Sequence, residues 1–314
     1  MTAVVVGAGL SGLVAAGRLQ AAGRDVVVLD KASVVGGRLA TARLGLGRLD
    51  TGAQFFTVRS EAFAAMVDPW LRSGLVYEWT RGFEDPPDGY PRYAVRGGMS
   101  ALAAHLADGL DVRLSTFVFA IRPAPAGWDV VVDDGSVLTA DGLVVACPVP
   151  QSASLLITSG LAVPEQLRRT DYDRTIALLS VLDGPGAVPA PGGVQQADDT
   201  FSFVADNRRK GISDVTALTL HVAAEPSRLH WDDPAADLEA WLLGAAGPWL
   251  GGAQVVATSV KRWRFATPQR TWPEACWASV DGRGAVAVAG DAFAGPKIEG
   301  AALSGVAAAE AVLA

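Results

Sequence analysis

The sequence predicts an α/β fold, and the two ends of the chain supply the observations behind this prediction. Residues 3–6 form a short β-branched run that ends in glycine, residues 10–22 carry apolar side chains at helical spacing, and residues 25–29 form a second apolar run. This order is typical of a βαβ unit with two buried parallel strands. At the other end, residues 285–289 form a last buried strand, and a helical pattern runs from about residue 299 onward.

Composition limits what the chain can be. Its 314 residues have room for about two domains. Half of the residues are hydrophobic and 19% are charged, which excludes intrinsic disorder because such a chain buries a large core. A formal charge of -7 argues against binding to nucleic acid or to anionic lipid. No apolar stretch is long enough to span a membrane. Two cysteines and three histidines give no disulfide framework and no metal-ligand spacing, so we expect a cytoplasmic protein without a metal.

The middle of the chain predicts a second domain inserted into the first. Several strand-like runs precede residue 146, with a hairpin turn at Asp133-Asp134-Gly135. From residue 151 the pattern changes to strands at 175–182 and 215–223, mixed with Pro/Gly loops and a helical stretch at 234–246. We predict a discontinuous first domain made of residues 1–60, 94–150 and 284–314, and a second domain made of residues 61–93 and 151–283.

A glycine-rich turn lies between the first strand and the first helix. Gly7, Gly9 and Gly12 fit the pattern G-x-G-x-x-G, and Asp30 follows at the end of the second strand. The first glycine permits a tight turn, the second lets the main chain approach a pyrophosphate, and the third allows close packing of helix and strand. The helix N-terminus favours phosphate, and Asp30 would accept hydrogen bonds from ribose hydroxyls. These features predict dinucleotide binding, against the alternative of a chance glycine-rich turn.

A second glycine pair, Gly36-Gly37-Arg38, follows soon after Asp30. The pairing of these two motifs resembles the extended fingerprint of the amine-oxidase superfamily of FAD enzymes, which implies that the second loop runs along the pyrophosphate. A second glycine pair lets another main-chain segment close on the cofactor, and Arg38 can bind phosphate oxygens through two parallel hydrogen bonds. We therefore expect FAD as the dinucleotide.

The C-terminal end carries a third element. Gly290-Asp291 ends the last buried strand, and residues 297–301 begin the last helix. They resemble the second flavin motif of the same superfamily, which implies that Asp291 binds the ribitol and that the helix N-terminus points at the flavin pyrimidine ring. Reduced flavin carries negative charge near N1 and C2=O, which a helix N-terminus stabilises.

The resemblance implies an FAD-binding Rossmann-like domain, of the glutathione-reductase or amine-oxidase type, with an inserted α+β substrate domain. It also implies a set of residues that would bind FAD without a covalent bond, while the Cys276 thiol leaves covalent attachment as the alternative. This set comprises Gly7, Gly9, Ser11, Gly12, Asp30, Lys31, Gly37, Arg38, Gln54, Phe55, Val118, Asp291, Ile298 and Ala301.

Four further segments resemble those of bacterial renalases. Residues 49–59, Leu-Asp-Thr-Gly-Ala-Gln-Phe-Phe-Thr-Val-Arg, match their pattern D-x-G-A-Q-[FY]-F-T-x-R. Residues 96–100 match their [KR]-x-G-M-S loop, and residues 261–268 match x-R-W-x-[FY]-A-x-P. Leu220-His221 matches their Leu-His pair.

This resemblance implies an oxidase that converts the 2- and 6-dihydro isomers of NAD(P)H to NAD(P)+, by hydride transfer to flavin N5 with O2 reduced to H2O2. Its partners would be such a dihydronicotinamide substrate and O2, with no nucleic acid and no membrane. Phe56 and Thr57 would contact the substrate, and Val118 would hold adenine through its main chain. The residues implied to act in catalysis are Gln54, Phe55, Arg59, Arg96 and His221.

Alternatives remain open for single residues and for the whole protein. Arg59 and Arg96 are either phosphate clamps or paired surface arginines, and His221 is either a substrate ligand or a satisfied buried histidine. The runner-up function is that of another FAD enzyme of the superfamily, oxidising an amine or desaturating a small molecule in a biosynthetic pathway. Several amine oxidases place a lysine near flavin N5, and no lysine here stands in a motif that matches that role. A third possibility is a non-catalytic escort protein of the same fold.

Overall fold

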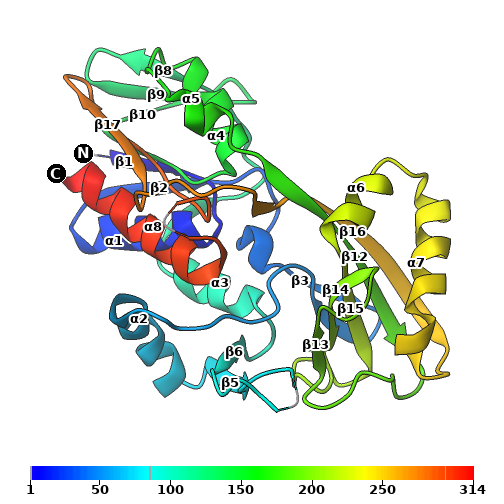
Figure 1. The fold of residues 1–314 in the computed structure, drawn as a ribbon. Helices are drawn as coiled ribbons and strands as arrows, with labels where there is room; N and C mark the ends of the chain where they lie inside the picture. The colour runs from blue at the N-terminus through cyan, green and yellow to red at the C-terminus, as the bar shows by residue number, and fades with distance from the viewer. Residues whose placement is uncertain (1, 85, 294) are drawn as a thin grey trace. The chain divides into compact units, whose positions relative to one another are not determined.

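The computed structural model describes residues 2–84, 86–293 and 295–314. It contains two compact units, each assembled from separate parts of the chain (Figure 1). The first unit comprises the residues up to Gly37 together with Ala103–Tyr172 and Thr267–Ala314. The second unit comprises Arg38–Leu102 and Asp173–Ala266.

A six-stranded sheet forms the centre of the first unit, in the order β17-β18-β11-β1-β2-β7. Five neighbouring strands are parallel and β17 is antiparallel, so the predicted βαβ unit is confirmed by the parallel pairing of β1 with β2. Its strands are β1 (Thr2–Val6), β2 (Asp25–Leu29), β7 (Asp111–Arg113), β11 (Gly142–Val145), β17 (Trp277–Asp281) and β18 (Gly284–Val288).

Two helices, α1 (Leu10–Ala21) and α8 (Lys297–Leu313), pack against each other in this unit (Figure 1). Their approach depends on glycine, because a Cβ on Gly305 of α8 would clash with the main-chain oxygen of Ser11 in α1. A Cβ on Gly12 would clash with the main-chain oxygen of Gly7, so α1 also packs closely on the turn that precedes it. The remaining elements are the sheet of β8 (Val118–Ala124), β9 (Gly127–Val132) and β10 (Val137–Ala140), with α4 (Val149–Ile157) and α5 (Glu165–Arg168). The hairpin predicted at Asp133-Asp134-Gly135 joins β9 and β10.

The second unit is built on a five-stranded sheet in the order β13-β14-β15-β12-β16. Leu238 and Leu242 of α7 (Ala235–Leu250) pack onto this sheet, and together they form the apolar core of the unit. The sheet strands are β12 (Tyr172–Leu182), β13 (Gly193–Gln195), β14 (Phe201–Asp206), β15 (Ala217–Val222) and β16 (Val255–Pro268). The short helix α6 (Ala224–Leu229) follows β15 along the chain.

Shorter elements complete the second unit and position its polar centre. The hairpin β3–β4 places Leu49 against Leu179, Val181 and Ala217 of the large sheet, and Asp50 ends β4. These elements are the 3-10 turn η1 (Gly37–Leu39), β3 (Thr41–Leu44), β4 (Gly47–Asp50), α2 (Glu61–Arg72), β5 (Val76–Thr80), β6 (Arg92–Val95) and the first residues of α3 (Ser100–Ala107), a helix that belongs to the first unit from Ala103 onward.

The units divide the chain near residues 37, 102, 172 and 266, whereas the sequence placed domain boundaries at 60, 94, 150 and 284. The difference arises because segment 38–60 pairs as a hairpin and packs on the second sheet, so its contacts lie within the second unit. In the described part of the chain, no helix combines the length and apolarity that crossing a membrane requires.

Replacing Gly305 by alanine should destabilise the first unit. The added Cβ meets main-chain atoms of Ser11, which cannot move aside as a flexible side chain would, and overpacking of this kind costs about 1–3 kcal/mol. Gly17→Ala in the middle of α1 is the matched control, because its Cβ would meet nothing within 4 Å and helix propensity favours alanine by about 0.5–1 kcal/mol. Thermal unfolding should show a lower midpoint for Gly305→Ala and an equal or higher one for Gly17→Ala. Equal midpoints for the two variants would contradict the packing argument.

Candidate functional site

The glycine-rich turn of the first unit has the open main chain that phosphate binding requires. Gly7 has a φ of 109° and donates its N–H to Leu29, which closes the turn. Helix α1 begins directly after Gly9, and no side chain caps its first N–H groups. A Cβ on Gly9 would meet no atom within 4 Å, so the space above this residue is open for a ligand. The turn therefore fits a pyrophosphate at the helix N-terminus.

Asp30 ties this turn to the end of β2. Its two carboxylate oxygens accept hydrogen bonds from the N–H groups of Ala8, at 2.6 Å, and Ala32, at 2.8 Å. Each carboxylate oxygen has a further lone pair, so the residue can still accept from ribose hydroxyls. Gly36 donates its N–H to Ala8, and a Cβ on Gly37 would lie 3.7 Å from the Cα of Gly9. The two glycine motifs thus lie against each other, as FAD binding along both would require.

The C-terminal flavin motif is also assembled in the first unit. Asp291 is buried and accepts a hydrogen bond from the Tyr172 hydroxyl at 3.3 Å. Helix α8 begins at Lys297 without a side-chain cap, and Ile298 and Ala301 of its first turns are buried. Val118, the residue expected beside adenine, begins β8 and is 5% exposed.

The second unit contains a cluster of polar contacts that centres on Asp50, which we call the Asp50 hub. One carboxylate oxygen of Asp50 accepts from the Thr41 hydroxyl at 2.6 Å and from the N–H of Met99 at 2.7 Å. The other lies 2.6 Å from Lys210 Nζ, and both of these side chains are fully buried. The carbonyl of Asp50 accepts from the Thr219 hydroxyl at 2.9 Å. Asp50 therefore joins β3, the loop before α3, the turn after β14 and strand β15.

Burial lowers the pKa of the Lys210 ammonium, and the adjacent Asp50 carboxylate opposes that shift. The Nζ atom also lies 5.2 Å from the centre of the Trp79 ring, a further favourable contact for a cation. Removing one member of such a buried pair leaves the other charge uncompensated in a medium of low dielectric. The Asp50 hub is thus strongly sensitive to loss of either charge.

The side chains of His221 and Trp263 both bind Thr51, the residue that follows Asp50. The carbonyl of Thr51 accepts from His221 Nε2 at 3.0 Å and from Trp263 Nε1 at 2.9 Å. Because a carbonyl can only accept, Nε2 of His221 carries the proton. Burial lowers the pKa of His221 from 6.5 to about 4, and the nearby Lys210 charge adds to this shift. His221 is therefore a neutral imidazole at pH 7, held by the D-x-G-A-Q segment.

Gln54 and the two phenylalanines that follow it have different surroundings. Gln54 is 5% exposed, and its amide nitrogen donates to the carbonyls of Asp50 and Gly52. Phe55 is half-buried, and its ring lies 5.2 to 6.4 Å from three others. Phe56 packs on a separate pair of rings. The rings beside Phe55, which we call with it the Phe55 cluster, are those of Trp79, Phe83 and Phe203.

The predicted arginines differ in their surroundings. Arg38 donates from one guanidinium nitrogen to the carbonyl of Ala266 at 3.0 Å. Arg96 is exposed, donates its Nε to the carbonyl of Gly74 at 3.0 Å and lies 5.3 Å from the Tyr77 ring. Arg59 is exposed. The structure thus places Arg59 and Arg96 at the surface of the second unit, where long cationic side chains can reach a ligand.

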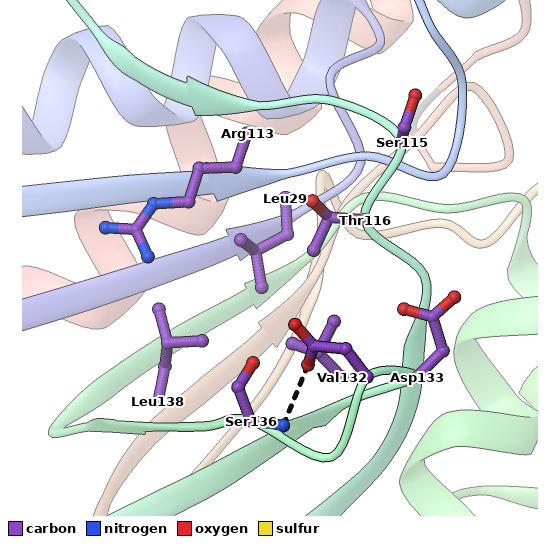
Figure 2. A pocket seen from close by; sticks show the side chains of 9 residues that line it. Leu29, Arg113, Ser115, Thr116, Val132, Asp133, Ser136 and Leu138 are labelled. Carbon is purple, nitrogen blue, oxygen red and sulfur yellow. Dashed lines mark hydrogen bonds between the residues drawn. The ribbon is translucent and has the colours of Figure 1, made fainter.

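A cavity of about 460 Å³ lies elsewhere in the first unit, between β2, β7 and the β9–β10 hairpin (Figure 2). Leu29, Val132 and Leu138 form its apolar lining, and Arg113 and Thr116 contribute polar atoms. Its nine lining residues include none of the predicted cofactor-binding or catalytic residues. The cavity nevertheless adjoins Asp30, because the N–H of Thr116 donates to the Asp30 carbonyl at 2.8 Å.

Sequence analysis missed Lys210, the residue that compensates the Asp50 charge. Lys210 lies in no recognised motif, and its partner stands 160 positions away in the sequence. One signal was present, since the chain has only four lysines among 26 basic residues and this one follows two arginines. Thr41 and Thr219, which also bind Asp50, carried no signal at all.

Comparison with known proteins identifies the family. The model of the family "Flavin containing amine oxidoreductase" matches residues 72–313, which is more than half of the chain. The chain belongs to this family. A second model, "NAD(P)-binding Rossmann-like domain", matches residues 5–70, the part that holds both glycine motifs. The protein is thus an FAD-dependent oxidoreductase, and the predicted α/β fold and cofactor are confirmed.

Solved structures of the same fold cover the whole chain. A putative protoporphyrinogen oxidase from Exiguobacterium sp. 255-15 is 14% identical with a TM-score of 0.75, and the match covers 98% of this chain and 97% of that one. A putrescine oxidase bound to putrescine is 16% identical with a TM-score of 0.75, and the match covers both chains fully. At these identities the likeness shows the fold alone.

A curated relative matches a short part of the chain. The phytoene dehydrogenase of Streptomyces griseus is 47% identical over 66 residues, which are 20% of this chain and 13% of that protein. The similarity is therefore confined to a small part of the relative.

Lys210→Met should destabilise the second unit by about 3–5 kcal/mol, because it leaves the Asp50 carboxylate buried without a counter-charge. Adding Asp50→Asn should recover part of the loss. Arg81→Met is the matched control, since Arg81 pairs with Glu78 at the surface of the same unit and such pairs contribute within about 1 kcal/mol. Chemical denaturation measures all three. A Lys210→Met variant as stable as Arg81→Met would refute the role of the pair.

The imidazole of His221 should stay neutral at pH values well below 6.5, the ordinary pKa of histidine. Its folded pKa of about 4 lies under the unfolded value of 6.5, so the unfolded state binds more protons between these values. Stability contributed by the neutral ring is therefore present above pH 6.5 and is lost as pH falls through that window, by on the order of 3 kcal/mol. Nitrogen-15 NMR of histidine-labelled protein should show the proton on Nε2 and no titration near pH 6.5. Titration of His221 at about pH 6.5 would be incompatible with this environment.

Proposed function

We propose that the protein oxidises the 2- and 6-dihydro isomers of NAD(P)H to NAD(P)+, with O2 reduced to H2O2. The observation that carries this proposal is the convergence of the four renalase-like segments on one structure. Gln54 of the first segment, Met99 of the second, Trp263 of the third and His221 of the fourth all bind main-chain or side-chain atoms of residues 50–52. Segments spread over more than 200 residues thus meet at a single region of the second unit.

The chemistry of this substrate class agrees with the side chains available. Oxidation of a dihydropyridine gives an aromatic cation, so the reaction needs orientation and an electron acceptor more than an acid–base pair. When bound, FAD supplies that acceptor and passes the electrons to O2. His221 is neutral and its Nε2 proton is held by Thr51, while the Asp50 carboxylate is paired with Lys210. The hub is therefore suited to hold shape and not to exchange protons with a substrate.

The residues of this chain divide the remaining tasks. Gln54 and the Phe55 cluster would orient the planar nicotinamide ring and exclude water from it, while Arg59 and Arg96 would bind the substrate's phosphates. In the first unit, the turn at Gly7, Gly9 and Gly12 would hold the pyrophosphate of FAD noncovalently, as its uncapped helix N-terminus supports.

A second candidate is oxidation of an amine or desaturation of a small molecule. The observation in its favour is the fold shared with a putrescine oxidase bound to putrescine, together with the local similarity to a phytoene dehydrogenase. A buried lysine, Lys210, is present in the second unit, but its ammonium is already bound to Asp50. This engagement favours the dihydronicotinamide proposal.

Anaerobic mixing with candidate substrates separates the two proposals. We expect rapid bleaching of the flavin by 2- or 6-dihydro-NAD isomers, much slower bleaching by ordinary 4-dihydro NADH, and peroxide on readmission of air. Arg59→Ala and Arg96→Ala should weaken substrate binding more than the limiting rate of reduction, since they act on phosphates away from the ring. Rapid bleaching by a simple amine, with no response to the isomers, would establish the second candidate instead.

A further inference from the structure

Gln54 carries a buried hydrogen-bond acceptor without a partner. Its Nε2 donates to the carbonyl of Asp50 at 2.7 Å and to that of Gly52 at 3.1 Å, which uses both N–H bonds of the amide. Turning the amide over would bring its oxygen against two carbonyl oxygens, so the network fixes its orientation. The side chain is 5% exposed, and its Oε1 makes no hydrogen bond.

This atom differs from the other buried polar atoms that lack a partner in the described ranges. Those are guanidinium, indole or hydroxyl groups, which carry a hydrogen of their own, whereas Gln54 Oε1 can only accept. A buried carbonyl without a donor is costly, and a ligand that supplies the donor recovers that free energy. The Asp50 carbonyl that holds the amide is itself fixed, since it also accepts from the Thr219 hydroxyl.

We propose that Gln54 is a specificity-determining residue, which presents Oε1 as a fixed acceptor to an amide-type N–H group on a planar heterocyclic ligand. The carboxamide of a nicotinamide offers this group. The choice of a planar ring follows from the next residue, Phe55, whose half-buried ring belongs to a cluster of four. A ligand that offers a carbonyl or carboxylate at this position would face oxygen against oxygen. This inference rests on the proposed function.

A comparison on the wild-type holoprotein tests the inference. NAD+ and its 3-acetylpyridine analogue, which has a methyl ketone in place of the carboxamide, are titrated while flavin absorbance is followed. NAD+ should bind roughly tenfold better than the analogue, the effect of one hydrogen bond. This readout does not depend on turnover.

The variant Gln54→Met tests whether the discrimination belongs to Gln54. It should abolish the tenfold preference seen in the wild type, because the thioether offers no comparable acceptor. Thr219→Val is the matched control, since it also removes a side-chain donor from the Asp50 carbonyl but carries no unpartnered atom, and it should keep the preference within about twofold.

Three results decide the matter. A preference that disappears in Gln54→Met and persists in Thr219→Val supports the proposal. A preference that persists in a folded Gln54→Met protein overturns it, and so does the absence of any preference in the wild type, whether or not the variant folds. If NAD+ is preferred over its analogue and the dihydronicotinamide isomers do not bleach the flavin, the inference stands while the proposed function fails.

Discussion

The buried ion pair of Asp50 and Lys210 is the interaction on which the second unit depends. Its two charges are fully buried and 2.6 Å apart, so each is tolerable only while the other is present. The pair fixes residues 50–54, a segment that leaves strand β4 and has no regular secondary structure after Asp50. Because this segment holds His221, Trp263 and Gln54 through its carbonyls, the orientation of each side chain follows from the position of one carboxylate.

In the first unit, close packing depends on glycine residues, which have no side chain. Gly12 and Gly305 let α1 approach the strand and α8, and Gly9 leaves open space at the helix N-terminus. Close packing of α1 brings its unpaired N–H groups to the end of β1, where Asp30 fixes the turn through the N–H of Ala8. The tight turn and the binding of a pyrophosphate both require glycine here, because a side chain would prevent other atoms from approaching the main chain closely.

The sequence predicted what depends on local pattern and recognised motifs, and it missed what depends on a long-range partner. Strands 3–6 and 25–29 were readable from β-branched runs, because parallel strands buried on both faces are continuously apolar. The role of Lys210 could not be predicted, because it depends on the Asp50 carboxylate, which lies 160 positions away in the sequence. His221 was left with two readings, and its bond to Thr51 shows how the ring is satisfied. Segment 38–60 lies in the second compact unit and not with residues 1–37, since its hairpin packs on strands that come far later in the chain.

Amide hydrogen–deuterium exchange of the wild-type holoprotein tests most directly whether the Asp50 hub holds this irregular segment rigid. The N–H groups of Thr51, Ala53 and Met99 are all hydrogen-bonded, the last of them to the Asp50 carboxylate at 2.7 Å. We predict that they exchange as slowly as those of strands β14 and β15 in the same unit, and that Lys210→Met accelerates them selectively. Exchange at the rate of unprotected amides in the wild-type protein would contradict the account.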